Sequence, residues 1–151
     1  MAKNISGRTI CAARGISPSA VDNFVRDYGF RTVDRSSGIP GKGRNWTYRD
    51  LLRLCLALRL HELGLAAFGS SELIPDLNDL PEGEKFVVVD IVDAGVDGDA
   101  RVPHAAFVRI VAEITAAELF NDAHRQVTVI PFSVIEADAQ VVLSFRASEE
   151  C

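Results

Sequence analysis

The sequence predicts an α+β fold with a mainly helical N-terminal part and a small C-terminal part of mixed helices and strands. In residues 9–63, apolar side chains repeat every three or four residues, the spacing of amphipathic helices. Residues 84–151 contain β-branched runs that are typical of strands. Between them, residues 67–83 are rich in Gly, Ser, Pro, Asp and Asn, which favour turns. We therefore expect one domain over residues 1–66, a linker over 67–83 and a second domain over 84–151.

The charge of the chain is divided between these two parts. Residues 1–66 carry eleven basic and five acidic side chains, a net charge of +6, whereas residues 67–151 carry five basic and sixteen acidic ones, a net charge of −11. This split suggests a basic module that binds a polyanion beside an acidic module with another role. The net charge of −5 for the whole chain therefore does not exclude a nucleic acid as the partner.

Several other classes of protein are disfavoured. Cys11, Cys55 and Cys151 lie far apart without CxxC spacing, and the three histidines are scattered, so we expect neither a disulfide framework nor a metal site. No nucleophile-elbow, P-loop or dinucleotide-binding motif occurs, and we expect no cofactor and no enzymatic activity. The N-terminus lacks the apolar core of a signal peptide, and no apolar run reaches membrane-spanning length. We expect a cytoplasmic protein with no membrane segment.

The first elements predict two helices joined by a tight turn. Residues 9–14 form a short helix that ends at Gly15, a residue favoured after helix ends. Ser17 then caps a second helix, over residues 19–28, with Pro18 at its first position, where the missing N–H costs nothing. Two helices with a Gly-containing turn between them are typical of a helix-turn-helix.

Residues 31–48 predict a β-hairpin whose tip is basic and rich in glycine. Thr47 then caps a third helix with Asp50 at its third position, an arrangement close to a capping box. This helix ends at Gly64 and has one apolar face, formed by Leu51, Leu54, Cys55 and Leu58.

The C-terminal part predicts mixed elements. Residues 85–93 form a strand, and residues 103–121 have the apolar spacing of a helix. Residues 126–136 and 139–145 form two strands joined by a hairpin turn at 136–138. Because so small a domain buries little core of its own, we expect it to pack against the third helix or a second copy of the chain.

Three stretches of the N-terminal part occur in a familiar order: Thr9-Ile10 with Ala13 and residues 15–19, then residues 44–51, then Leu54 to Leu65. Together they resemble the winged helix-turn-helix DNA-binding domain of the MerR family over about residues 8–65. The resemblance implies that the second helix lies in the major groove and that the hairpin, or wing, grips the adjacent backbone. No long coiled-coil helix follows Gly64 and the effector cysteines of metal-sensing members are absent, so metal-responsive regulation is not implied.

The resemblance also implies which side chains contact DNA. Ser17 and Ser19, at a helix N-terminus, can hold a phosphate, and the amide of Asn23 can pair with an adenine edge. The basic side chains neutralise backbone charge, although Arg26 can also reach a base, and Tyr48 adds a hydroxyl contact to phosphate. The expected DNA-binding residues are Ser17, Ser19, Asn23, Arg26, Arg31, Arg35, Lys42, Arg44 and Tyr48.

We therefore expect a transcriptional regulator that binds specific double-stranded DNA as a homodimer. The C-terminal domain would supply the dimer contact, a pocket for a small-molecule effector or a surface for a protein partner. The alternative is an accessory factor of a phage or mobile element, active in recombination or DNA packaging, whose acidic domain recruits an integrase or packaging motor. A third hypothesis, an enzyme or small-molecule binder, requires converging polar groups in residues 84–151, and none is evident.

Overall fold

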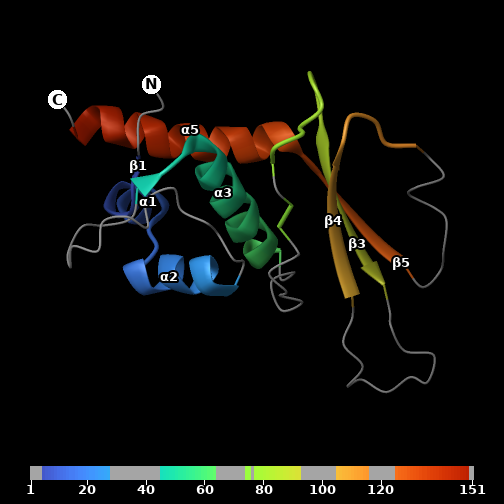
Figure 1. The fold of residues 1–151 in the computed structure, drawn as a ribbon, viewed down its shortest axis with the longest axis horizontal. Coiled ribbons are helices and arrows are strands. Elements are labelled where there is room, and N and C mark those ends of the chain that lie inside the picture. Colours follow the sequence, from blue (N-terminus) through green and yellow to red (C-terminus); the bar gives the residue numbers. More distant parts are fainter. Residues whose placement is uncertain are drawn as a thin grey trace, which may run out of the picture.

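The computed structural model describes residues 5–27, 45–63, 74–75, 77–92, 105–115 and 125–149. Along the chain the elements are β1 (Ile5–Ser6), α1 (Gly7–Arg14), α2 (Pro18–Asp27), β2 (Asn45–Trp46), α3 (Tyr48–Glu62), β3 (Phe86–Val92), β4 (Ala105–Val111), β5 (Arg125–Pro131) and α5 (Phe132–Glu149) (Figure 1). The helices and the antiparallel sheet of β3, β4 and β5 confirm the predicted α+β class. Within these stretches, no helix is long and apolar enough to cross a membrane.

The first two helices begin and end where local chemistry favours it. Ser6 caps α1, its hydroxyl accepting a hydrogen bond of 3.1 Å from the amide of Thr9. At the other end Gly15 has a φ of +63°, and the amide of Ile16 donates to the carbonyl of Cys11 at 3.1 Å, as in a Schellman motif. The predicted pair of helices with a turn at Gly15 is therefore confirmed.

A short two-stranded sheet ties the beginning of α1 to the beginning of α3. Strands β1 and β2 are antiparallel, with Ile5 paired to Trp46, and both side chains are almost fully buried. Thr47 then caps α3: its hydroxyl accepts from the amide of Asp50 at 3.1 Å and donates to the Asp50 carboxylate at 3.0 Å. The predicted cap at Thr47 and Asp50 is confirmed.

Helix α3 is the central helix of the fold and is buried on more than one face. Besides the predicted apolar face, a second row at four-residue spacing is buried, formed by Leu52, Leu56 and Leu60. A helix that is apolar around most of its circumference needs partners on several sides. Helix α5 crosses α3 on one side. The sheet of β3, β4 and β5 lies beyond the C-terminal end of α3, which is the end away from β2 (Figure 1).

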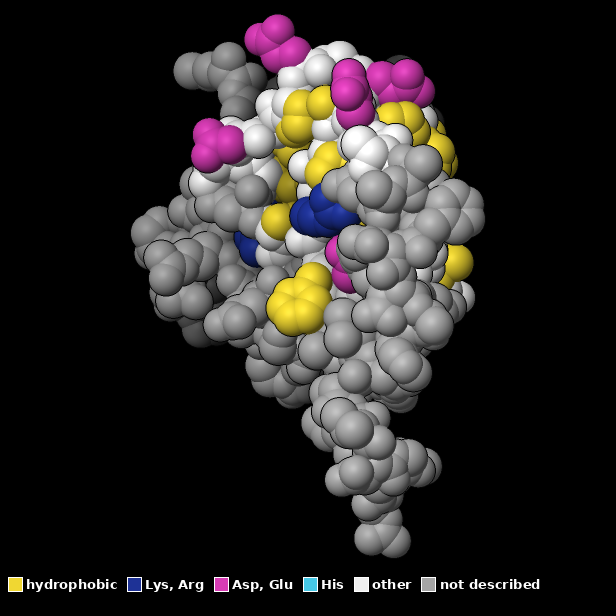
Figure 2. All heavy atoms as spheres, turned by 90° about the vertical axis from the view of Figure 1, so that its right-hand side faces the viewer, with side chains coloured by type: hydrophobic (Ala, Val, Ile, Leu, Met, Phe, Trp, Pro, Cys, Tyr) yellow, Lys and Arg dark blue, Asp and Glu magenta, His cyan; other side chains and the backbone are white. Residues whose placement is uncertain are grey.

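The sheet has the order β4-β3-β5, with every neighbouring pair antiparallel. The register places Val87 and Val89 of β3 on the inner face, where they join the hydrophobic core. On the outer face, Asp90 forms an ion pair with Arg109 at 3.4 Å, while Phe107 is 60% exposed. Figure 2 views this side and shows hydrophobic side chains gathered around basic ones.

Two predictions for the C-terminal part are wrong. The helix expected over residues 103–121 is strand β4 at 105–111, because alternate side chains there pack against the core while the backbone pairs with β3. The strand expected over 126–136 is confirmed as β5 as far as residue 131, but its end, the turn expected at 136–138 and the strand expected over 139–145 belong to the single helix α5. Helix formation lets Phe132, Ile135, Ala139 and Val142, spaced three or four residues apart, enter the core together.

Helix α5 connects the N-terminal and the C-terminal parts of the structure. It begins directly after β5 and packs against both α1 and α3 (Figure 1). One hydrophobic cluster consequently includes Ile10 of α1, Leu56 of α3, Val87 of β3 and Ile135 of α5. The N-terminal helices and the C-terminal elements therefore share a core.

Candidate nucleic-acid interface

The N-terminus of α2 presents two serine hydroxyls to solvent. The Ser17 hydroxyl accepts a hydrogen bond of 3.2 Å from the amide of Ala20, and it shares one of 3.0 Å with the hydroxyl of Ser19. Both serines are exposed. Because the start of a helix carries partial positive charge, this arrangement favours an anion such as a phosphate.

The following turn of α2 separates an anchor from a polar face. Val21 is 5% exposed and belongs to the hydrophobic core, whereas Asp22 and Asn23 are exposed. Arg26 lies on the same helix, but its side chain is outside the described part of the structure. Ser17, directly before α2, and Ser19, Asp22 and Asn23 within it thus present two hydroxyls, a carboxylate and an amide at exposed positions.

The remaining predicted contacts fall in two groups. Arg31, Arg35, Lys42 and Arg44, with most of the predicted hairpin, lie outside the described residues. Tyr48 begins α3 and is 41% exposed, and its hydroxyl hydrogen-bonds to the side chain of Gln140 on α5. This hydrogen bond was not expected from the sequence and connects Tyr48 to the C-terminal helix.

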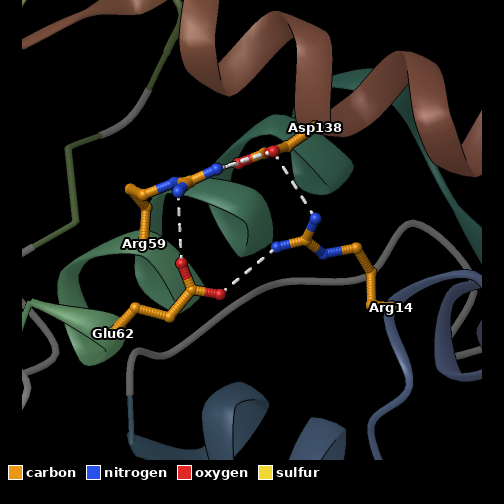
Figure 3. A network of polar contacts seen from close by, with 4 residues as sticks. All are labelled: Arg14, Arg59, Glu62 and Asp138. Atoms are coloured by element: carbon orange, nitrogen blue, oxygen red, sulfur yellow. Dashed lines mark hydrogen bonds and ion pairs between the residues drawn. The ribbon is translucent and has the colours of Figure 1, made fainter.

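Behind the turn between α1 and α2 lies a cluster of four charged side chains from three helices (Figure 3). Asp138 of α5 accepts hydrogen bonds from Arg59 of α3, at 2.7 and 2.8 Å from Nη2 and 3.2 Å from Nε. Arg14, the last residue of α1, reaches the same carboxylate from Nη1 at 3.5 Å. Glu62 closes the ring, 3.3 Å from Arg59 and 3.6 Å from Arg14.

The burial of Asp138 requires that its charge be balanced by other side chains of the cluster. Asp138 is only 8% exposed, so its carboxylate requires the two guanidinium groups to offset the loss of water. The hydrogen bonds to Asp138 in turn raise the pKa of Arg59 above its usual value. Burial also raises the pKa of the Cys55 thiol to about 12, which keeps this residue of α3 neutral and unreactive.

The sequence predicts a hairpin turn at residues 136–138 and therefore does not predict Asp138 as the residue that organises this cluster. The signal was nevertheless present, since Asp138 interrupts the apolar helical row of Ile135, Ala139 and Val142. An acidic residue within such a row needs a buried cationic partner. Across the described stretches, no group of three His, Cys, Asp or Glu side chains could hold a metal ion.

Replacing Gly15 by alanine tests how strongly the turn depends on a left-handed backbone. A Cβ at this position would meet nothing within 4 Å, so the cost is conformational and amounts to about 1–2 kcal/mol of unfolding free energy. Gly15→Asn is the matched control and is expected to lose less, because asparagine tolerates this conformation. Urea denaturation followed by far-UV circular dichroism measures both. Equal stability of the alanine variant and the parent would contradict the expectation.

Comparison of the chain with protein-family models, with curated proteins and with solved structures gave no match.

Proposed function

We propose that this protein is a regulator that binds specific double-stranded DNA sequences, with α2 placed in the major groove. The observation that carries the proposal is the exposed polar face of α2, formed by Ser17, Ser19 and Asn23 and anchored from behind by Val21. A helix held in this way can enter the groove, where its first turn contacts phosphate and the next turn contacts base edges.

The charge of the N-terminal part supports the proposal. The net charge of +6 over residues 1–66 suits a polyanion and would supply the salt-dependent part of the affinity. The exposed carboxylate of Asp22 would repel phosphate but can accept a hydrogen bond from the amino group of cytosine. The resemblance of residues 8–65 to MerR-like domains adds the winged helix-turn-helix architecture and the wing contacts from Arg31, Arg35, Lys42 and Arg44 to the proposal.

Homodimer formation is part of the same proposal. One short recognition helix reads few base pairs, and two copies related by a two-fold axis would read two half-sites. A dimer predicts a palindromic target, and sedimentation at micromolar concentration would give the dimer mass. A monomer mass together with a palindromic target would require that the second copy assembles on the DNA.

Selection of bound sequences from a random duplex library, at near-physiological salt, tests the proposed function. We expect the parent to enrich a defined motif, and Asn23→Ala to lose about 1–3 kcal/mol at one base pair, roughly 5- to 150-fold in affinity. Arg26→Ala is expected to weaken binding further, in proportion to its contacts with phosphate or base.

Ser144→Ala is the matched control, because Ser144 is an exposed residue of α5. Helix α5 lies on the other side of α1 from α2 (Figure 1). This variant should bind the selected motif as the parent does. If no motif is enriched and all binding disappears as salt is raised, the protein has only a basic surface and the proposal is wrong.

A further inference from the structure

We propose that Asp138 is a positioning residue for DNA recognition: from the C-terminal helix it fixes the end of α1 and so orients α2. This inference rests on the proposed function, and it identifies how the C-terminal part takes part in it. Asp138 lies 124 residues from Arg14 in the sequence, yet the two side chains meet behind the turn (Figure 3).

The first step of the argument is the position of Arg14. It is the last residue of α1, and Gly15 directly follows it, so any displacement of Arg14 is passed to the turn and to Ser17. Among the described side chains of α2, Val21 is the one that is buried in the core. Val21 holds the first turns of α2 against the core, and the turn at Gly15 sets the point from which α2 begins.

The second step is that the Asp138 carboxylate makes shorter contacts with Arg59 than with Arg14. Arg59 takes the short contacts, at 2.7 and 2.8 Å, whereas Arg14 lies at 3.5 Å from the carboxylate and at 3.6 Å from Glu62. The Nε of Arg14 is buried without a hydrogen-bond partner. Arg14 is therefore held mainly by charge rather than by short hydrogen bonds, and it is the member of the cluster that loss of the Asp138 charge would release first.

The third step is the element that carries Asp138. It belongs to α5, which continues from the end of β5 and packs against both α1 and α3. A change in the sheet or in α5 therefore reaches the end of α1 through this carboxylate. The network connects the C-terminal elements with the helix pair proposed to read DNA.

Asp138→Asn isolates the charge, since asparagine has nearly the same shape and keeps one oxygen that can accept from Arg59. Arg14→Gln is the second variant, and it leaves the hydrogen bonds between Asp138 and Arg59 in place. Asp90→Asn is the matched control, because Asp90 is equally buried, at 7% exposed, and pairs with Arg109 in the sheet.

Hydrogen exchange of the free protein gives a readout that does not depend on DNA. We expect roughly tenfold faster exchange of the amides of residues 11–20 in Asp138→Asn and in Arg14→Gln, with α3 and the sheet unchanged. Asp90→Asn should change only the sheet. Faster exchange of all elements together, or unchanged exchange at residues 11–20, would mean that the cluster contributes only stability and would overturn the inference. Should Asp138→Asn fail to fold, Arg14→Gln decides.

The second readout is the ratio of affinities for the selected motif and for a random duplex. Misorientation of α2 is expected to lower this ratio roughly five- to fiftyfold in Asp138→Asn, while affinity for the random duplex stays unchanged. A purely structural role would lower both affinities equally, by reducing the folded fraction, and would overturn the inference. If the parent enriches no motif, the proposed function fails, whereas hydrogen exchange still decides whether Asp138 positions α2.

Discussion

Residues 1–66 expressed alone are expected not to fold cooperatively, which is the largest effect that the structure implies. The N-terminal helices share their core with Ile74, Val87, Ile130, Phe132, Ile135 and Val142, all of which the fragment lacks. The apolar residues of α3 would then face water on the side that α5 covers. A domain as short as residues 1–66 buries a smaller fraction of its surface than a longer one and is marginally stable even with a complete core, so loss of these contacts leaves little stability.

Thermal unfolding of the fragment and of the full chain, followed by circular dichroism, measures this effect. We expect a sharp transition for the full chain and a broad, non-cooperative change for the fragment. The predicted domain boundary at residues 67–83 is tested by the same experiment. A sharp transition in the fragment would show that residues 1–66 fold as an independent domain.

Replacing Phe132 by alanine is expected to lower the free energy of unfolding by about 3–5 kcal/mol. Phe132 is fully buried at the point where β5 passes into α5, and its amide donates a hydrogen bond of 2.9 Å to the carbonyl of Lys85. The Nζ of Lys85 also lies 5.4 Å from the centre of the Phe132 ring, a cation–π contact that alanine would abolish. The substitution therefore leaves a cavity and removes a ring contact at one junction.

Phe107→Ala is the control for this substitution. It also removes a phenyl ring, but from strand β4, where Phe107 is 60% exposed, so the expected loss is within about 0.5 kcal/mol. Urea denaturation midpoints of the two variants and the parent measure the difference. Similar losses for both variants would mean that the burial assigned to Phe132 is wrong.

The sequence predicts the N-terminal helices well because their signals are local. The turn at Gly15 and the cap formed by Thr47 with Asp50 each depend on a few adjacent residues, and the structure confirms them. The second apolar row of α3, which includes Leu56, is also present in the sequence, within the continuous apolar run of residues 54–58. This row shows that α3 needs packing partners on more than one side, and the structure places it against α5 in a core that also includes Val87 of the sheet.

The C-terminal elements could not be predicted in the same way. Residues 105–111 fit a helix and a strand almost equally, and pairing with β3 decides between them. In α5, the β-branched Val141 and Val142 favour a strand locally, and packing against α1 and α3 overrides that preference. The contact of Asp138 with Arg14 can be predicted only when α5 is already known to be a helix. The predicted DNA contacts at Ser17, Ser19 and Asn23 stay predictions, although all three side chains are exposed.

The packing of α5 against α1 has a consequence for how the chain folds during its synthesis. The residues of α1 are synthesised before those of α5, and Asp138 is added 124 residues after Arg14. Until then, Ile10 and the apolar rows of α3 lack their last neighbours and remain open to non-specific association. Contacts of such large sequence separation also slow folding, because a long loop must close before they form. We therefore expect the nascent chain to depend on chaperones more than a domain completed by its first sixty residues would.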